Sequence, residues 1–161
     1  MPTLKASAAE MVQSIKKGEI TSEELVKSYI EQIKKKEKDV EAWEFFDPEL
    51  ALAQAKKLDE LHQSGKHGDL HGIPVGIKDI FDTEDMPTTD GTEIHKKNLS
   101  WNDCTVVSKL KQAGAVIMGK TVTAELAYYS PGKTKNPHDT TRTPGGSVSY
   151  THLTLPTILL V

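Results

Sequence analysis

The chain of 161 residues contains a single cysteine, Cys104, and few aromatic residues. One cysteine excludes an internal disulfide, and its surroundings, WNDCTVV, carry no recognisable signature of a thiol nucleophile. No apolar run approaches the ~20 residues that a membrane-spanning helix needs, and the N-terminal residues lack the apolar core of a signal peptide. We therefore expect a cytoplasmic protein without a membrane partner.

The chain also lacks an excess of positive charge. It has 20 Lys and Arg against 23 Asp and Glu, which gives a formal net charge of −3. No basic stripe with interleaved aromatic residues is present, so we expect no direct nucleic-acid partner. The 37% of hydrophobic residues is enough for a core. The length fits one domain, or a piece of a larger one.

Helical patterns dominate the first sixty residues. Apolar residues recur at spacings of three and four between residues 4 and 15, which predicts a first helix. Thr21 and Glu24 have the spacing of a capping box in front of a second striped segment. Asp47-Pro48 pairs a capping carboxylate with a proline suited to a first helical turn, so a third helix is expected there.

The pattern changes at residue 73. IPVGI (73–77) and AVIM (115–118) are short, apolar and bounded by turn residues, which predicts two strands. CTVVSKLKQAGA (104–115) predicts a helix between them. TVTAELAYY (121–129) predicts another helix, capped by Thr121 or Thr123. The alternation of strands and helices behind a helical N-terminal region indicates an α/β fold.

Lys78 stands at the end of the first predicted strand, in HGIPVGIKDI. One interpretation is that its stem packs while its ammonium group reaches water. The other is a desolvated lysine, because burial disfavours the charged form and leaves an amine able to accept a proton. A neutral lysine beside a serine is a known way to activate a nucleophile. Elsewhere in the chain, Ser147 follows two glycines in TPGGS that let the backbone approach another group closely, although Gly-Gly-Ser by itself is typical of an ordinary loop.

GAVIMGKT (114–121) matches the sequence pattern G-x-x-x-x-G-K-[ST] of a phosphate-binding loop. Its four middle residues are apolar, however, and a helix rather than a strand is expected before Gly114, so a core strand is the better interpretation. A nucleotide-binding protein that uses Lys120 remains the alternative from another functional class. The backbone of 114–121 decides between them, because a phosphate loop must curl around an anion.

His67 and His71 are four residues apart, but they lie in a glycine-containing loop. Helix geometry therefore does not place them on one face, and no Cys-x-x-Cys or paired carboxylate completes a metal-binding set nearby. We interpret them as solvated loop histidines and expect no metal site.

Three segments together resemble the amidase signature family: HGIPVGIKDIFD (71–82), GAVIMGKTVTAELAY (114–128) and NPHDTTRTPGGS (136–147). The resemblance implies N-terminal helices leading into a mixed β-sheet flanked by helices. It also implies hydrolysis of a linear, small-molecule amide by a Ser–cisSer–Lys triad without metal or cofactor. In this family a lysine is the base, which matches Lys78, and a bridging serine matches Ser147. Tyr128 and Tyr129 align with a stretch that lines the acyl pocket.

Two further expectations rest on the resemblance. The segment YYSPGKTKNPHDTTRTPGG favours a stand-alone amidase over the glutaminase subunit of a tRNA-dependent amidotransferase, which shares the triad. The family is also compatible with a homodimer of the full-length protein.

The similarity covers nearly all of residues 4–147, and we expect 1–147 to be the N-terminal part of one amidase domain. The family's attacking serine lies in a further Gly-Gly-Ser loop downstream, whereas this chain continues as VSYTHLTLPTILLV. We therefore expect 148–161 to be a non-native tail and the chain as given to be inactive. If the tail is genuine, a non-catalytic binding module remains an alternative.

Overall fold

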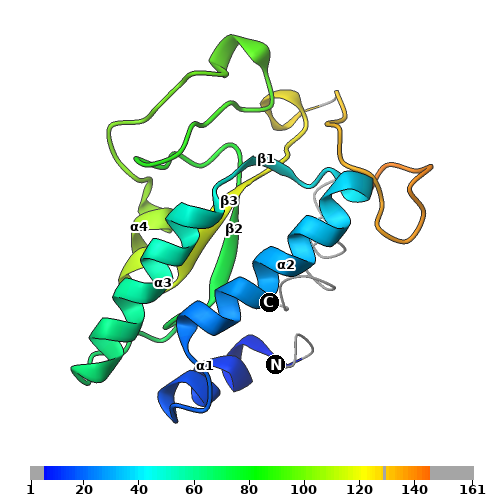
Figure 1. The fold of residues 1–161 in the computed structure, drawn as a ribbon. Coiled ribbons are helices and arrows are strands. Elements are labelled where there is room, and N and C mark those ends of the chain that lie inside the picture. The colour runs from blue at the N-terminus through cyan, green and yellow to red at the C-terminus, as the bar shows by residue number, and fades with distance from the viewer. Residues whose placement is uncertain (1–5, 129, 146–161) are drawn as a thin grey trace.

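The computed structural model describes residues 6–128 and 130–145, and these residues form a mixed sheet with helices on both faces (Figure 1). The fold class expected from the sequence is confirmed. No helix of the described part is long and apolar enough to cross a membrane. In chain order the elements are α1 (Ala8–Lys16), α2 (Ser22–Val40), β1 (Trp43–Phe46), α3 (Pro48–Gln63), β2 (Pro74–Lys78), the 3-10 turn η1 (Glu93–His95), α4 (Thr105–Gln112), β3 (Val116–Thr121) and the 3-10 turn η2 (Glu125–Ala127).

Local capping signals determine where the first three helices begin. Ser7 accepts a hydrogen bond from the Glu10 amide at the start of α1, and the Glu10 carboxylate accepts from the Ser7 amide. The expected capping box of α2 is confirmed, with 3.0 Å from the Glu24 amide to the Thr21 hydroxyl and 2.9 Å for the reciprocal bond. Asp47 caps α3 in the predicted manner. These starts need no tertiary contact, so they could be predicted.

The central strand is β3, with β2 parallel on one side and β1 antiparallel on the other. The sequence pattern did not indicate β1, which is only four residues long. It exists because it pairs with β3, where Trp43 lies opposite Thr121 and Phe46 lies opposite Gly119. A Cβ atom at Gly119 would overlap the Phe45 carbonyl oxygen, so glycine is what allows β1 to approach.

The helix predicted over 121–129 is wrong. Thr121 belongs to β3, and its carbonyl oxygen accepts from the Asp79 amide at 3.0 Å, so it does not cap a helix. The following residues form only η2, in which Leu126 and Ala127 have left-handed φ values of 50° and 56°. Sheet pairing thus overrides the local helical pattern.

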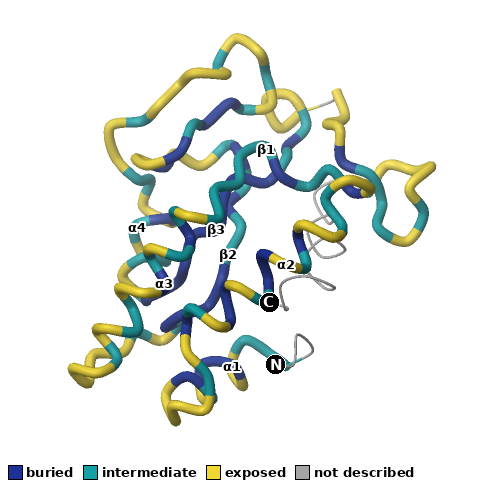
Figure 2. Tube along the Cα trace, in the orientation of Figure 1, coloured by how far each residue is buried: buried dark blue, intermediate teal, exposed yellow. Residues whose placement is uncertain are grey.

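Alternate residues of β3 build two apolar layers. Val116 and Met118 pack with α1, α2 and α3, whereas Ile117 packs on the other face with Val107 of α4. Figure 2 shows the buried sheet between helices whose outward sides are exposed. The loop after β2 and the segment after β3 both leave at the same edge of the sheet, because parallel strands end on the same side (Figure 1).

Candidate active site

Lys78 is the last residue of β2, with its Cα opposite Thr121 of the central strand. It is half-buried. The chain turns immediately afterwards, because the amides of Ile80 and Phe81 both donate to the Lys78 carbonyl oxygen, at 2.8 and 3.0 Å. The predicted strand end is therefore confirmed, while the role of Lys78 stays a prediction. Its side chain starts from the edge where parallel α/β sheets usually bind their ligands.

The next residue, Asp79, forms a fully buried ion pair with Lys120. Their charged atoms lie 3.1 Å apart. The Lys120 ammonium group also donates to the Pro87 carbonyl oxygen at 3.1 Å and to the Thr88 hydroxyl at 2.6 Å. These three acceptors match the three donors of an ammonium group. The pair thus joins the end of β2, the end of β3 and the loop between residues 79 and 90.

Asp79 is held from the loop side as well. Its carboxylate accepts from the Thr89 amide, at 3.1 and 3.2 Å, and from the Thr89 hydroxyl. Sequence reasoning missed this network, although one signal was available. A lysine in the apolar strand VIMGKT needs a buried counter-charge, because lysine is almost never fully buried unless it is paired.

The same geometry excludes the phosphate-loop alternative. Residues 116–121 are an extended strand, every residue of which is buried, and both of its neighbours are strands. Gly114 has a φ of 86° and follows the end of α4 instead of beginning an anion-binding turn. Lys120 points its ammonium group at Asp79, so the proposed nucleotide-binding role of Lys120 is wrong.

Of the other predicted site residues, the structure describes only Tyr128. It follows η2 and is 78% exposed. Ser147 and Tyr129 lie outside the described residues. The segment that leads toward Ser147 is fastened to the end of α2, since the Lys135 amide donates to the Val40 carbonyl oxygen at 2.8 Å and the Thr134 hydroxyl donates to the Glu41 carbonyl oxygen at 2.9 Å.

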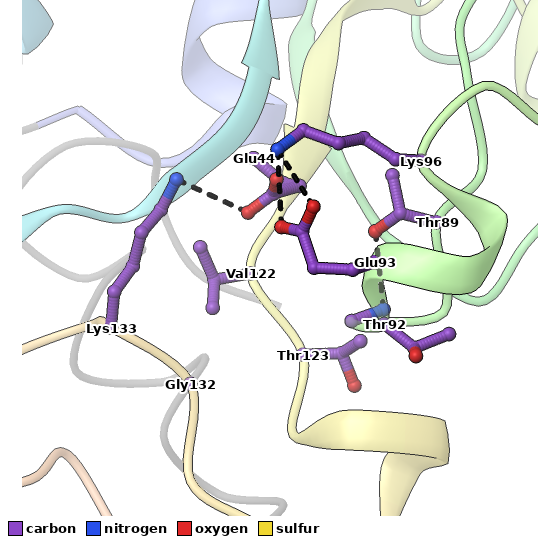
Figure 3. Close-up of a pocket in the computed structure, with 10 residues that line it drawn as sticks. Glu44, Thr89, Thr92, Glu93, Lys96, Val122, Thr123, Gly132 and Lys133 are labelled. Carbon is purple, nitrogen blue, oxygen red and sulfur yellow. Dashed lines mark hydrogen bonds and ion pairs between the residues drawn. The ribbon is translucent and has the colours of Figure 1, made fainter.

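A cavity of about 150 Å³ lies beyond the end of β3 (Figure 3). Its wall carries two ion pairs, Lys133 with Glu44 at 3.1 Å and Lys96 with Glu93 at 2.9 Å. This volume is smaller than the several hundred Å³ of a usual small-molecule site. Lys78 is not among the described residues that line it, so the cavity does not define a substrate pocket around the lysine.

A family model described as Amidase matches residues 24–149. The chain belongs to the amidase family. The match includes Lys78, Asp79 and Lys120, so the buried ion pair and the strand-end lysine both lie in the part that the family shares. The resemblance noted from the sequence is thereby confirmed.

Curated relatives are named as the A subunits of glutamyl-tRNA(Gln) amidotransferases. The protein from Streptomyces coelicolor is 40% identical over 151 residues, which cover 89% of this chain and 30% of the relative. The one from Lachnospira eligens is 41% identical over 154 residues, covering 91% and 32%. The chain thus spans about a third of the length of the curated relatives it matches.

Solved amidases have the same fold. The peptide amidase from Stenotrophomonas maltophilia superposes with a TM-score of 0.84 at 29% identity, covering 92% of this chain and 33% of that one. A bacterial aryl acylamidase superposes with a TM-score of 0.86 over 99% of this chain and 35% of its own, and at 23% identity this likeness concerns the fold alone.

The histidines differ from expectation. His71 is 1% exposed, so the interpretation of it as a solvated loop residue is wrong. Burial, followed by the charges of His67 and His62, lowers the pKa of His71. Sequence spacing did not reveal this arrangement, because the loop folds back onto the end of α3 and adds His62 to the group.

Proposed function

We propose that this chain supplies the base and the bridging serine of an amidase that cleaves a linear carboxamide through an acyl-enzyme. Lys78 is the base and Ser147 is the bridge. The observation that carries this proposal is the half-buried lysine at the end of β2, next to a buried ion pair that fixes the loop after it. A base must be held in a defined position to transfer protons efficiently.

In the proposed reaction the attacking serine gives its proton to Ser147, and Ser147 passes a proton to Lys78. The serine oxygen then bonds to the amide carbon, the C–N bond breaks and the amine leaves with a proton. Water cleaves the ester that remains, which releases the acid and restores the serine. No residue within 1–147 matches the attacking serine, so we place the nucleophile outside this segment and take 148–161 to be foreign to the domain.

Tyr128 and Tyr129 are proposed to contact the acyl part of the substrate. The segment 126–128 leaves the edge of the sheet at which β2 also ends, which supports a location near Lys78. Tyr128 is also exposed at the surface of the described part of the chain.

A second candidate is a glutaminase that releases ammonia for a tRNA-dependent amidotransferase. The names of the curated relatives, which are 36–41% identical, favour it. The two candidates use the same triad and differ in substrate and partners, since a glutaminase of this kind works with further subunits, whereas a stand-alone amidase would act alone or as a homodimer.

The test is kinetic and uses the full-length protein that contains this segment. A Lys78→Ala variant should lower kcat/KM by about 10²–10⁴, the usual contribution of general base catalysis. Lys34→Ala removes an exposed lysine of α2 and serves as the matched control. Full activity of Lys78→Ala would refute the assignment. Glutamine hydrolysis that exceeds hydrolysis of aryl and aliphatic amides would select the amidotransferase candidate.

The 161-residue chain itself should not hydrolyse a simple aryl amide, because Lys78 and Ser147 have no serine to activate. Turnover by this chain above the level of its own Lys78→Ala variant would contradict the placement of the nucleophile.

A further inference from the structure

Three histidines gather at the end of β2 opposite to Lys78. His62 lies in the last turn of α3, His67 in the loop that follows, and His71 just before β2. The Nδ1 atoms of His62 and His67 are 3.1 Å apart. One ring nitrogen from each of the three histidines lies within 4.8 Å of the other two. The rings of His62 and His67 also lie close to that of His71, with centroids 5.9 and 5.3 Å away.

His71 is the fixed member of this group. The residue is 1% exposed, yet its Nε2 atom has no hydrogen-bond partner among the residues that the structure describes. The ring also hydrogen-bonds the Leu58 backbone, and a contact of this kind orients metal-binding histidines in many proteins. Buried imidazole nitrogens are normally satisfied, so the Nε2 atom of His71 is a candidate to bind a ligand.

The spacing fits a metal ion. Two nitrogens bound to a tetrahedral zinc at ~2.0–2.1 Å lie roughly 3.3 Å from each other, close to the separation of the His62 and His67 nitrogens. The exposed side chain of His67 is free of the core and can adjust toward His71.

The donor set selects the kind of ion. Imidazole nitrogens suit zinc and related transition metals, whereas magnesium and calcium prefer oxygen. Asp59 is the carboxylate whose charge acts on His71, but its oxygens accept from the amides of Ser22 and Glu23 at 2.7 and 3.0 Å. It is therefore engaged at the start of α2, and the three histidines form the binding group.

We propose that His62, His67 and His71 bind one Zn²⁺ ion or a related transition-metal ion, with a fourth position left to water. The ion ties the end of α3 to the start of β2 and so holds the loop 64–70 in place. Lys78 is at the opposite end of β2 (Pro74–Lys78), and a strand rises about 3.3 Å per residue, so the strand alone puts about 13 Å between the ion and Lys78. Its role is structural and independent of the amide chemistry.

Zinc binding to the metal-free 161-residue chain, measured by isothermal titration calorimetry at pH 7.5, tests the proposal. The natural chain should bind one Zn²⁺. His67→Ala removes an exposed ring without disturbing the core, and His62→Gln removes the helix ligand; each should weaken binding by at least about tenfold. His138→Ala, which removes an exposed histidine of another loop, is the matched control and should bind as the natural chain does.

A thermal melt adds a second readout. Zinc should raise the melting temperature of the natural chain and of His138→Ala, but not that of His67→Ala. Equal zinc affinity in the natural chain and in His67→Ala would overturn the proposal, because the ion would then bind elsewhere. The absence of stoichiometric binding by the natural chain would also overturn it and would leave only a hydrogen bond between His62 and His67.

Discussion

The buried pair of Lys120 and Asp79 gives the sharpest test of how this fold is held together. In Lys120→Met the methionine fills most of the space of the lysine, but the Asp79 carboxylate stays buried at 0% exposure without its counter-charge. Removing one partner of a buried ion pair costs about 3–5 kcal/mol. A domain is stable by only about 5–15 kcal/mol, so this single change removes at least about a fifth of the free energy of unfolding.

Most of this cost comes from leaving the Asp79 carboxylate buried without a counter-charge, so removing that charge as well should restore much of the lost stability. In the double variant Asp79→Asn with Lys120→Met, no charge remains, and the asparagine oxygen still accepts from the Thr89 amide. The double variant should therefore be more stable than the sum of the single changes predicts, by about 1–3 kcal/mol.

Urea unfolding followed by far-ultraviolet circular dichroism measures these free energies. Lys34→Met is the control for the methionine, because Lys34 is exposed on α2, and it should change stability by less than about 0.5 kcal/mol. A cost for Lys120→Met as small as that of the control would refute the reasoning. Strict additivity of the two single variants would refute it as well.

Two further changes probe the sheet and the loop above it. Gly119→Ala places a Cβ atom against the Phe45 carbonyl oxygen, so it should push β1 from β3 and cost about 1–3 kcal/mol in the same urea assay; a neutral effect would show that β1 is not packed as described. Burial by itself lowers the pKa of Lys111, but hydrogen bonds to Asp103 and Asp85 together outweigh it and raise the pKa above 10.5. Lys111→Met removes these bonds, so it should lower the free energy of unfolding by about 1 kcal/mol at pH 7, and by less in high salt. A raised lysine pKa stabilises the fold at every pH below the pKa of the unfolded chain. The difference in free energy of unfolding between the natural chain and Lys111→Met should therefore persist from pH 7 to 9 and shrink only above about 10.5. A difference already lost at pH 9 would contradict the pairing.

The starts of the helices could be predicted because their signals are local. Thr21 with Glu24, and Asp47 with Pro48, contain within a few residues the groups that satisfy the first free amides of a helix. The strand that ends at Lys78 could be predicted for a similar reason, since its apolar run and flanking turn residues are contiguous. The family resemblance also rests on contiguous sequence motifs, and the family match confirms it.

The predictions that failed depend on partners distant in the chain. Segment 43–46 is a strand only because β3 pairs with it. The helix predicted from Thr121 does not form because Thr121 is the last residue of β3 and pairs with Trp43. A short window of sequence contains neither partner. Local propensity therefore predicted a helix from Thr121 onward, although pairing in the sheet stabilises the extended conformation of that residue more strongly.

The sequence by itself determined the helix caps, the position of Lys78 at a strand end and the family. Only the tertiary structure decided that Asp79 pairs with Lys120 across two strands, and that a loop returns to place His67 and His71 beside His62. The physical reason is the same in both cases. Burial and convergence of polar groups are properties of packed surfaces, and they arise only after segments far apart in the chain have been brought together.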